Sequence, residues 1–147
     1  MCLYLESKLC FDEADDSELI LHPITGRNLG TIDTLTSQKA SIHEGGIQMN
    51  VGALRHIKKL HAQQIQKEEL YDISLFVWNV IRDYEKIYEG SNDSILLSKD
   101  YDENNAVVAI GFIDKDGVYR VKTAGIRRKR GFKNKRLLFE RKGANPL

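Results

Sequence analysis

Hydrophobic periodicity changes near Gly90, and this change limits the possible folds more than any other property of the sequence. Residues 50–65 carry apolar side chains at helical spacing behind Asn50, which is a favourable N-cap residue. Residues 68–90 carry a longer apolar stripe, with acids in the first turn and Gly90 as a stop signal. We therefore predict two helices that pack against each other.

Four short apolar segments follow Gly90, and tight turns separate them. The segments are SILLSKD, AVVAIGFI, VYRVKTA and NKRLLFE. The pair Asp116-Gly117 is a strong hairpin signal, and the basic sequence GIRRKRG, residues 125–131, is predicted to be a loop. This order predicts an α+β fold, in which two N-terminal helices pack on one face of a four-stranded antiparallel sheet and leave the other face open.

The front third of the chain gives weaker signals. We interpret residues 1–45 as an N-terminal extension, partly irregular and partly β-prone (residues 31–38), with an acidic segment, FDEADDSE, at residues 11–18. Residues 46–147 are predicted to form the main domain, since a chain of 147 residues suits a single core. The acidic segment could fold over a basic face elsewhere, or it could be a solvated tail.

Charge is distributed unevenly along the chain. The 22 Lys and Arg residues and 21 Asp and Glu residues give a net charge of only +1. From Arg120 to Leu147, however, eleven basic residues accompany one acid, Glu140, so this stretch carries +10 and the preceding 119 residues carry −9. Such asymmetry predicts a polyanionic partner for the C-terminal part.

Strand alternation gives the basic residues a direction. Along VYRVKTA, Tyr119, Val121 and Thr123 are predicted on one face, and Arg120 with Lys122 on the other. If the apolar set faces the helices, the two cations project from the open face of the sheet.

Clustered guanidinium groups bind phosphate, and a sheet face suits RNA better than duplex DNA. The predicted RNA-binding residues are Arg120, Arg127, Arg128, Lys129, Arg130 and Lys133. The alternative is that Arg127–Arg130 is only a solvated loop.

Two histidines lie in the first predicted helix. At 100° per residue His61 falls within the apolar face, whereas His56 lies near the opposite side. This i, i+5 spacing does not stack two imidazoles, and Cys2 and Cys10 have no further ligand residues beside them, so we predict no metal site and two free thiols. His61 is either a satisfied core histidine or a functional group at the seam between helix and sheet.

The element RHIKKLH and the stretch YDENNAVVAIGFIDKDGVYRVKTAGIRRKR, with the last strand, resemble phage and mobile-element polyvalent-protein nucleases of the barnase, EndoU, colicin and RelE-like superfamily. The similarity covers roughly residues 51–140. In that group a His-rich first helix and a strand with a Lys-Thr pair recur in this order. The resemblance implies that His56, His61, Lys122 and Thr123 occupy the catalytic positions.

The resemblance implies a metal-independent endoribonuclease without a cofactor, often deployed as a toxin. A base deprotonates the ribose 2′-hydroxyl, cations stabilise the phosphorane, and an acid protonates the departing 5′-oxygen, which leaves a 2′,3′-cyclic phosphate. We expect Lys122 and Arg120 to stabilise the phosphate, and one helix histidine to act as base or acid. Thr123 is either a core hydroxyl or acts through the twist at the strand's end. Unlike a barnase-like catalyst, the predicted strands contain no histidine.

A non-catalytic RNA-binding or protein-docking module is the rival interpretation, because the sequence lacks a self-sufficient catalytic motif such as a P-loop. The predicted partners are RNA and an acidic immunity or antitoxin protein. No run approaches the roughly 18 apolar residues of a membrane span, and residues 1–10 lack the pattern of a secretory signal. We therefore predict a cytoplasmic protein without a membrane partner, and a monomer because no heptad seam is present.

Overall fold

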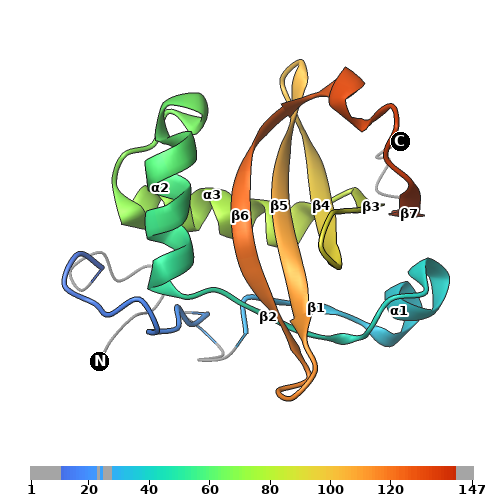
Figure 1. The fold of residues 1–147 in the computed structure, drawn as a ribbon, viewed down its shortest axis with the longest axis horizontal. Helices are drawn as coiled ribbons and strands as arrows, with labels where there is room; N and C mark the ends of the chain where they lie inside the picture. Colours follow the sequence, from blue (N-terminus) through green and yellow to red (C-terminus); the bar gives the residue numbers. More distant parts are fainter. Residues whose placement is uncertain (1–10, 23, 25–27, 142–147) are drawn as a thin grey trace.

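The computed structural model describes residues 11–22, 24 and 28–141, so Cys2 and Cys10 lie outside the described part. In that part, three α-helices and one seven-stranded sheet form an α+β fold (Figure 1). The sheet order is β1-β2-β6-β5-β4-β3-β7, and β2 pairs with β6 in parallel while the other pairs are antiparallel. The predicted α+β class is confirmed. The predicted arrangement of two helices on a four-stranded antiparallel sheet is wrong in detail, because the described part has three helices and a seven-stranded mixed sheet.

The helices are α1 (Thr34–Ala40), α2 (Val51–Ile65) and α3 (Leu70–Asp83). The strands are β1 (Gly30–Ile32), β2 (Gly45–Gln48), β3 (Lys86–Glu89), β4 (Ser94–Tyr101), β5 (Asn104–Ile113), β6 (Val118–Arg128) and β7 (Leu137–Glu140). A 3-10 turn, η2 (Lys129–Phe132), connects β6 to the segment that leads into β7.

Helix α2 begins where the sequence predicts. The Asn50 side chain accepts a hydrogen bond from the Ala53 amide at 2.9 Å, which confirms the N-cap. Leu54 and Ile57 are fully buried, whereas Leu60, which shares their helical spacing, is 57% exposed. The apolar stripe of α2 is therefore narrower than the sequence suggests.

Helix α3 is shorter than predicted, because it ends at Asp83 rather than at Gly90. Tyr84 has φ −55° and ψ 146°, which is an extended conformation that leaves the helix. The following residues form β3, in which Ile87 is buried and pairs with Leu97 of β4. Apolar residues at this spacing suit either a helix or a strand, and pairing with β4 decides between them.

The strands after Gly90 form at the predicted places, with one correction for the predicted basic loop. Gly117 has φ +66° in the β5–β6 turn, as its hairpin signal requires. Residues 125–128 are not a loop, because β6 continues to Arg128, which pairs with Asn104 of β5. Strand β7 pairs with β3 and not with β6, so the last connection crosses the sheet.

The front part of the chain adds elements that the sequence analysis did not predict. Residues 34–38 belong to helix α1, because the Asp33 side chain caps it through the Thr36 amide at 2.8 Å. The acidic segment packs against α2, since the Asp16 carbonyl accepts from the Gly52 amide at 2.9 Å and Phe11 is buried. The segment is therefore held on α2 and does not cover the basic face, while most of its acidic side chains stay exposed.

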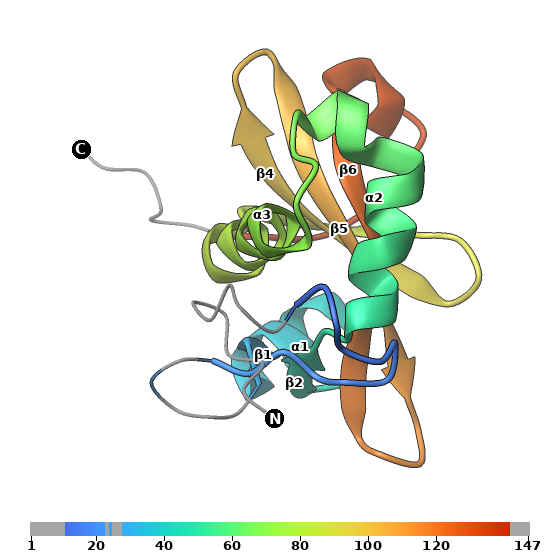
Figure 2. The same ribbon diagram turned by 90° about the vertical axis from the view of Figure 1, so that its left-hand side faces the viewer.

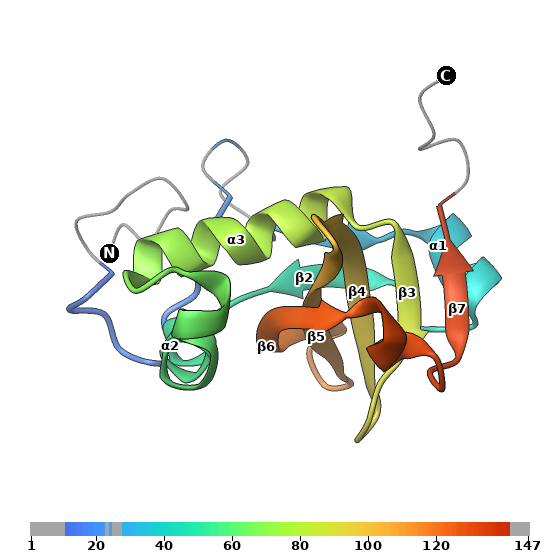
Figure 3. The ribbon, with the colours of Figure 1, turned by 90° about the horizontal axis from the view of Figure 1, so that it is seen from above.

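The sheet separates two hydrophobic clusters. The main core lies between the sheet and helices α2 and α3 (Figure 2). A smaller cluster on the other face joins Leu96, Val107 and Ala109 to Phe132 of η2. We call this second side the open face; Figure 3 shows α3 on one side of the sheet and η2 on the other. Among the described residues, no helix is long and apolar enough to cross a membrane.

Candidate nucleic-acid interface

A β-bulge in β6 sets the direction of the predicted Lys-Thr pair. Ala109 of β5 pairs with Thr123, but the next residue, Ile110, pairs with Val121. Lys122 is therefore an extra residue in β6 without a partner on β5. Thr123 shares a register position with Ala109 and so lies on the open face, not on the helix face that simple alternation predicts.

Lys122 lies across the open face. Its Nζ donates to the Asn92 carbonyl in the β3–β4 turn at 3.3 Å, and the residue is exposed. A Cβ atom on Gly111 of β5 would lie 2.5 Å from Lys122 Cε. Gly111 therefore leaves the space through which the lysine side chain crosses β5.

Arg120 projects from the same face, near β2. It pairs with Gly111 across the β5–β6 ladder, and its Nε donates to Gln48 Oε1 at 3.0 Å. One terminal guanidinium nitrogen lies 3.8 Å from Asp116 Oδ2. Arg120 is consequently held by two partners beside the β5–β6 turn.

Helix α2 covers the outer edge of β6 where β2 does not continue. Strand β2 pairs only with Tyr119 and Arg120 among the residues of β6. Further along, Gln64 of α2 accepts a hydrogen bond from the Ile126 amide at 2.7 Å. A side-chain amide thus satisfies a backbone donor that a neighbouring strand would otherwise bind.

Gly125 allows this close approach of helix and strand. A Cβ atom at this position would lie 2.7 Å from Gln64 Oε1 and 3.4 Å from His61 Nδ1. Sequence reasoning missed both Gln64 and Gly125. The available signal was the glycine itself, because a glycine inside a strand often marks the close approach of another group.

A cavity of about 260 Å³ lies at this seam. Its walls and floor include His61, Gln64, Leu96, Val107, Ala109, Thr123, Gly125 and Arg127. The Thr123 hydroxyl is buried and has no hydrogen-bond partner among the described residues. The structure therefore brings together His61, Thr123 and Arg127, whereas Lys122 and Arg120 lie elsewhere on the open face.

The two helix histidines differ in environment. His61 is half-buried, and burial lowers its pKa below the ordinary value of 6.5. The charge of His56 lowers the pKa of His61 further. His56 itself is exposed and does not line the cavity. A half-buried imidazole with a lowered pKa is mostly neutral at pH 7 and can accept a proton.

The other predicted RNA-binding residues lie at the end of β6 and in the turn that follows. The Arg127 guanidinium carbon lies 5.6 Å from the centroid of the Phe132 ring. Arg128, Arg130 and Lys133 are exposed. These residues therefore present exposed positive charge at a strand end, in a 3-10 turn and directly after it.

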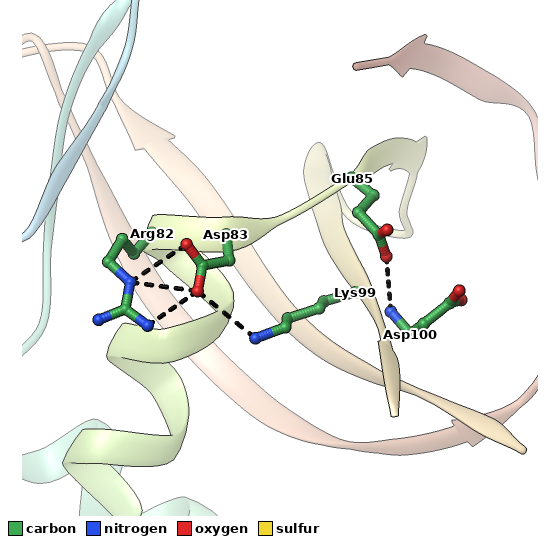
Figure 4. Close-up of polar contacts among 5 residues, drawn as sticks. All are labelled: Arg82, Asp83, Glu85, Lys99 and Asp100. Carbon is green, nitrogen blue, oxygen red and sulfur yellow. Dashed lines mark hydrogen bonds and ion pairs between the residues drawn. The ribbon is translucent and has the colours of Figure 1, made fainter. Parts of the chain in front are cut away.

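Lys129 belongs to a network of charged groups. Its Nζ lies 3.1 Å from Asp100 Oδ1, and the Asp100 amide donates to Glu85 at 2.8 Å. Beside this pair, Asp83 accepts hydrogen bonds from Arg82 and Lys99, as Figure 4 shows. The bond from Arg82 is the main reason that the pKa of Asp83 is lowered. Lys129 is itself exposed, and its charge is partly offset by Asp100.

In residues 11–22, 24 and 28–141, no group of three or more His, Cys, Asp and Glu side chains is placed to hold a metal ion. Comparisons with protein-family models, with curated proteins and with solved structures found no match. The similarity to the barnase, EndoU, colicin and RelE-like superfamily thus stays a prediction, which these comparisons leave untested.

Proposed function

We propose that this chain is a metal-independent endoribonuclease whose RNA substrate lies on the open face of the sheet. The observation that carries the proposal is the cavity that His61, Thr123 and Arg127 line together. Attack by a ribose 2′-hydroxyl on phosphate needs a base and a group that stabilises negative charge, and a neutral imidazole and a guanidinium can fill these two roles.

The proposed roles follow from these groups. His61 accepts the proton of the 2′-hydroxyl, and its lowered pKa keeps it neutral for this step. Arg127 stabilises the negative charge that develops on the phosphate, and the Thr123 hydroxyl hydrogen-bonds to the substrate. The bond from the 2′-oxygen to phosphorus forms, the bond to the 5′-oxygen breaks, and that oxygen takes a proton from water. The product end is a 2′,3′-cyclic phosphate.

The remaining cations of the open face bind the RNA chain in this proposal. Lys122 and Arg120 contact phosphates elsewhere on the open face, and Arg128, Arg130 and Lys133 extend the positive surface at the end of β6. The wider role that the resemblance implies, a toxin of a phage or mobile element held by an acidic immunity protein in the cytoplasm, belongs to the same proposal.

A non-catalytic RNA-binding module is the second candidate, and two observations favour it. Lys122 extends to Asn92, and Arg120 is held by Gln48, so these cations do not converge on His61. Among the described residues, no other histidine and no carboxylate lines the cavity as a second proton donor. Both candidates place RNA on the open face, and they differ only in chemistry.

End-labelled single-stranded RNA, incubated with the purified protein in EDTA, separates the two candidates. We expect cleavage that leaves cyclic phosphate ends, lost in His61→Ala and reduced in Arg127→Gln. Lys67→Ala removes an exposed charge beyond the end of α2 and serves as the matched control, with circular dichroism as the check of folding. RNA that is bound in a salt-dependent way but left intact would favour the module. RNA that is neither bound nor cut would contradict both candidates.

A further inference from the structure

We propose that the helix side of the sheet holds a second binding site, for a nucleoside whose base carries an exocyclic amino group. The site is a cavity of about 690 Å³ between the end of α1, the β3–β4 turn and the end of β5. This volume lies in the range of roughly 300–1,000 Å³ that is usual for small-molecule sites. The residues that carry the proposal are His43, Phe112, Tyr119, Asp93, Asp114 and Arg136.

His43 forms a flat platform in this cavity. Its ring stacks on Phe112 with a centroid distance of 4.0 Å and an interplanar angle of 8°. The buried Tyr119 hydroxyl donates to the His43 carbonyl at 2.6 Å, and Tyr119 also contacts Phe112 edge-on. His43 is exposed, so a planar ligand can stack on the ring that Phe112 and Tyr119 hold in place.

The backbone next to His43 is fixed by a close contact with the β5–β6 turn. A Cβ atom on Gly45 would lie 2.7 Å from the Gly117 carbonyl oxygen. The two segments therefore touch through their backbones, and only glycine permits this distance. The platform is thus held in position before a ligand arrives, which lowers the ordering cost of binding.

The rim of the cavity is rich in hydrogen-bond acceptors. Asp93 and Asp114 line it, and neither side chain has a hydrogen bond or ion pair with another described residue. Ionised carboxylates accept hydrogen bonds and do not donate them. A ligand that satisfies them needs N–H or O–H donors at the edge of a flat ring, and an amino-bearing nucleobase with its ribose hydroxyls has both.

Arg136 places one positive charge at this rim, beside the carboxylates of Glu89, Asp93 and Asp114. A neutral nucleoside can donate hydrogen bonds to the carboxylates, and a phosphate on its ribose could pair with Arg136. The site is also separate from the cavity of His61, since no residue lines both cavities. The inference does not rest on the proposed nuclease function.

Titration calorimetry on the full chain tests this site with adenosine, cytidine and uridine. We expect adenosine and cytidine to bind more tightly than uridine, because an exocyclic amino group offers two N–H donors to the carboxylates, whereas the uracil ring has only its N3–H. His43→Ala should weaken adenosine binding by about tenfold, since that is the usual contribution of one stacked ring. His43→Phe should retain stacking, and Asp114→Asn should weaken binding without changing the platform.

The variants separate nucleoside binding at this second site from binding at the cavity of His61. Adenosine binding that survives in His61→Ala and Arg127→Gln, but weakens in His43→Ala and Asp114→Asn, would support the second site. No nucleoside binding at millimolar concentration would overturn it, and so would binding that depends on His61 rather than on His43. If His43→Ala does not fold, the Asp114→Asn and His43→Phe proteins decide between these outcomes.

Discussion

The two cavities each contain one histidine, but they surround it differently. His61 is half-buried above Thr123 and Gly125, with Arg127 beside it. His43 is exposed, stacks on Phe112, and has carboxylates around it. The first environment changes the protonation of an imidazole, and the second presents its flat surface. A net charge near zero therefore conceals a cationic site on one face and an anionic one on the other.

Both histidines depend on a glycine that allows two segments to touch. At Gly125 an added Cβ would meet Gln64 Oε1 at 2.7 Å, and at Gly45 it would meet the Gly117 carbonyl oxygen at the same distance. The two glycines differ in the kind of atom that an added Cβ would contact. The end of a glutamine side chain can move, whereas the backbone of a tight turn cannot move without breaking the turn.

The largest expected effect is on stability, and it compares these two glycines. Gly45→Ala should lower the free energy of unfolding by about 2 kcal/mol, because the turn must shift. Gly125→Ala should cost about 1 kcal/mol, since Gln64 can give up its bond to the Ile126 amide. The entropic gain of replacing glycine is the same in both and cancels. Urea unfolding measures the difference.

Gly131→Ala is the control for this comparison, because an added Cβ there would meet only the exposed Arg127 side chain, at 3.0 Å. A Gly125→Ala protein that is less stable than Gly45→Ala would show that α2 is held more rigidly against β6 than the turn is against β2. The contact at Gly125 would then be the more rigid of the two, contrary to the expectation that the Gln64 side chain moves more easily than the turn.

Tyr119→Phe has a smaller expected effect, confined to the region of His43. The substitution removes the bond to the His43 carbonyl and should cost about 1 kcal/mol. Burial raises the pKa of Tyr119 to about 12, above its ordinary value of 10.0. Its ionisation is thus easier in the unfolded chain, so its contribution is complete below pH 10 and is lost as the pH rises toward 12.

Urea unfolding at pH 8 and at pH 11 tests whether the stabilising contribution of Tyr119 is lost as the pH rises. The wild-type protein should lose more stability than Tyr119→Phe between the two values, while cleavage of RNA stays unchanged in the variant at pH 8. Equal losses in both proteins would contradict the assignment of the buried hydroxyl.

Local signals in the sequence predict much of the fold, and pairing between distant segments decides the rest. Asn50 caps α2 and Gly117 turns the β5–β6 hairpin, because each acts within a few residues of itself. Residues 86–89 have a pattern that a helix would also tolerate, and they form β3 because an edge of β4 is available. No local signal reports that edge.

The candidate site shows the same limit. The sequence identifies Lys122 and Thr123 as neighbours on a strand but cannot show the bulge, which changes the face on which Thr123 lies. One of the two alternatives for His61 was the seam of helix and sheet, and the half-buried imidazole lines a cavity there. The close approach of His61 to Gly125 depends on how closely α2 packs against β6. The glycine within the strand was the one sequence signal of this contact.

The smallest expected effect concerns the pH dependence of cleavage and rests on the proposed nuclease. If neutral His61 is the base, the rate rises with pH as His61 loses its proton, with a midpoint below 6.5 because its pKa is lowered. Burial is the larger cause and the charge of His56 the smaller. His56→Ala removes the smaller cause, so the midpoint should rise toward 6.5 without reaching it. Cleavage rates from pH 4 to 8 measure this, with Lys67→Ala as the control. A midpoint that falls in His56→Ala would contradict the assignment of His61 as the base, because removing the charge of His56 can only raise the pKa of His61.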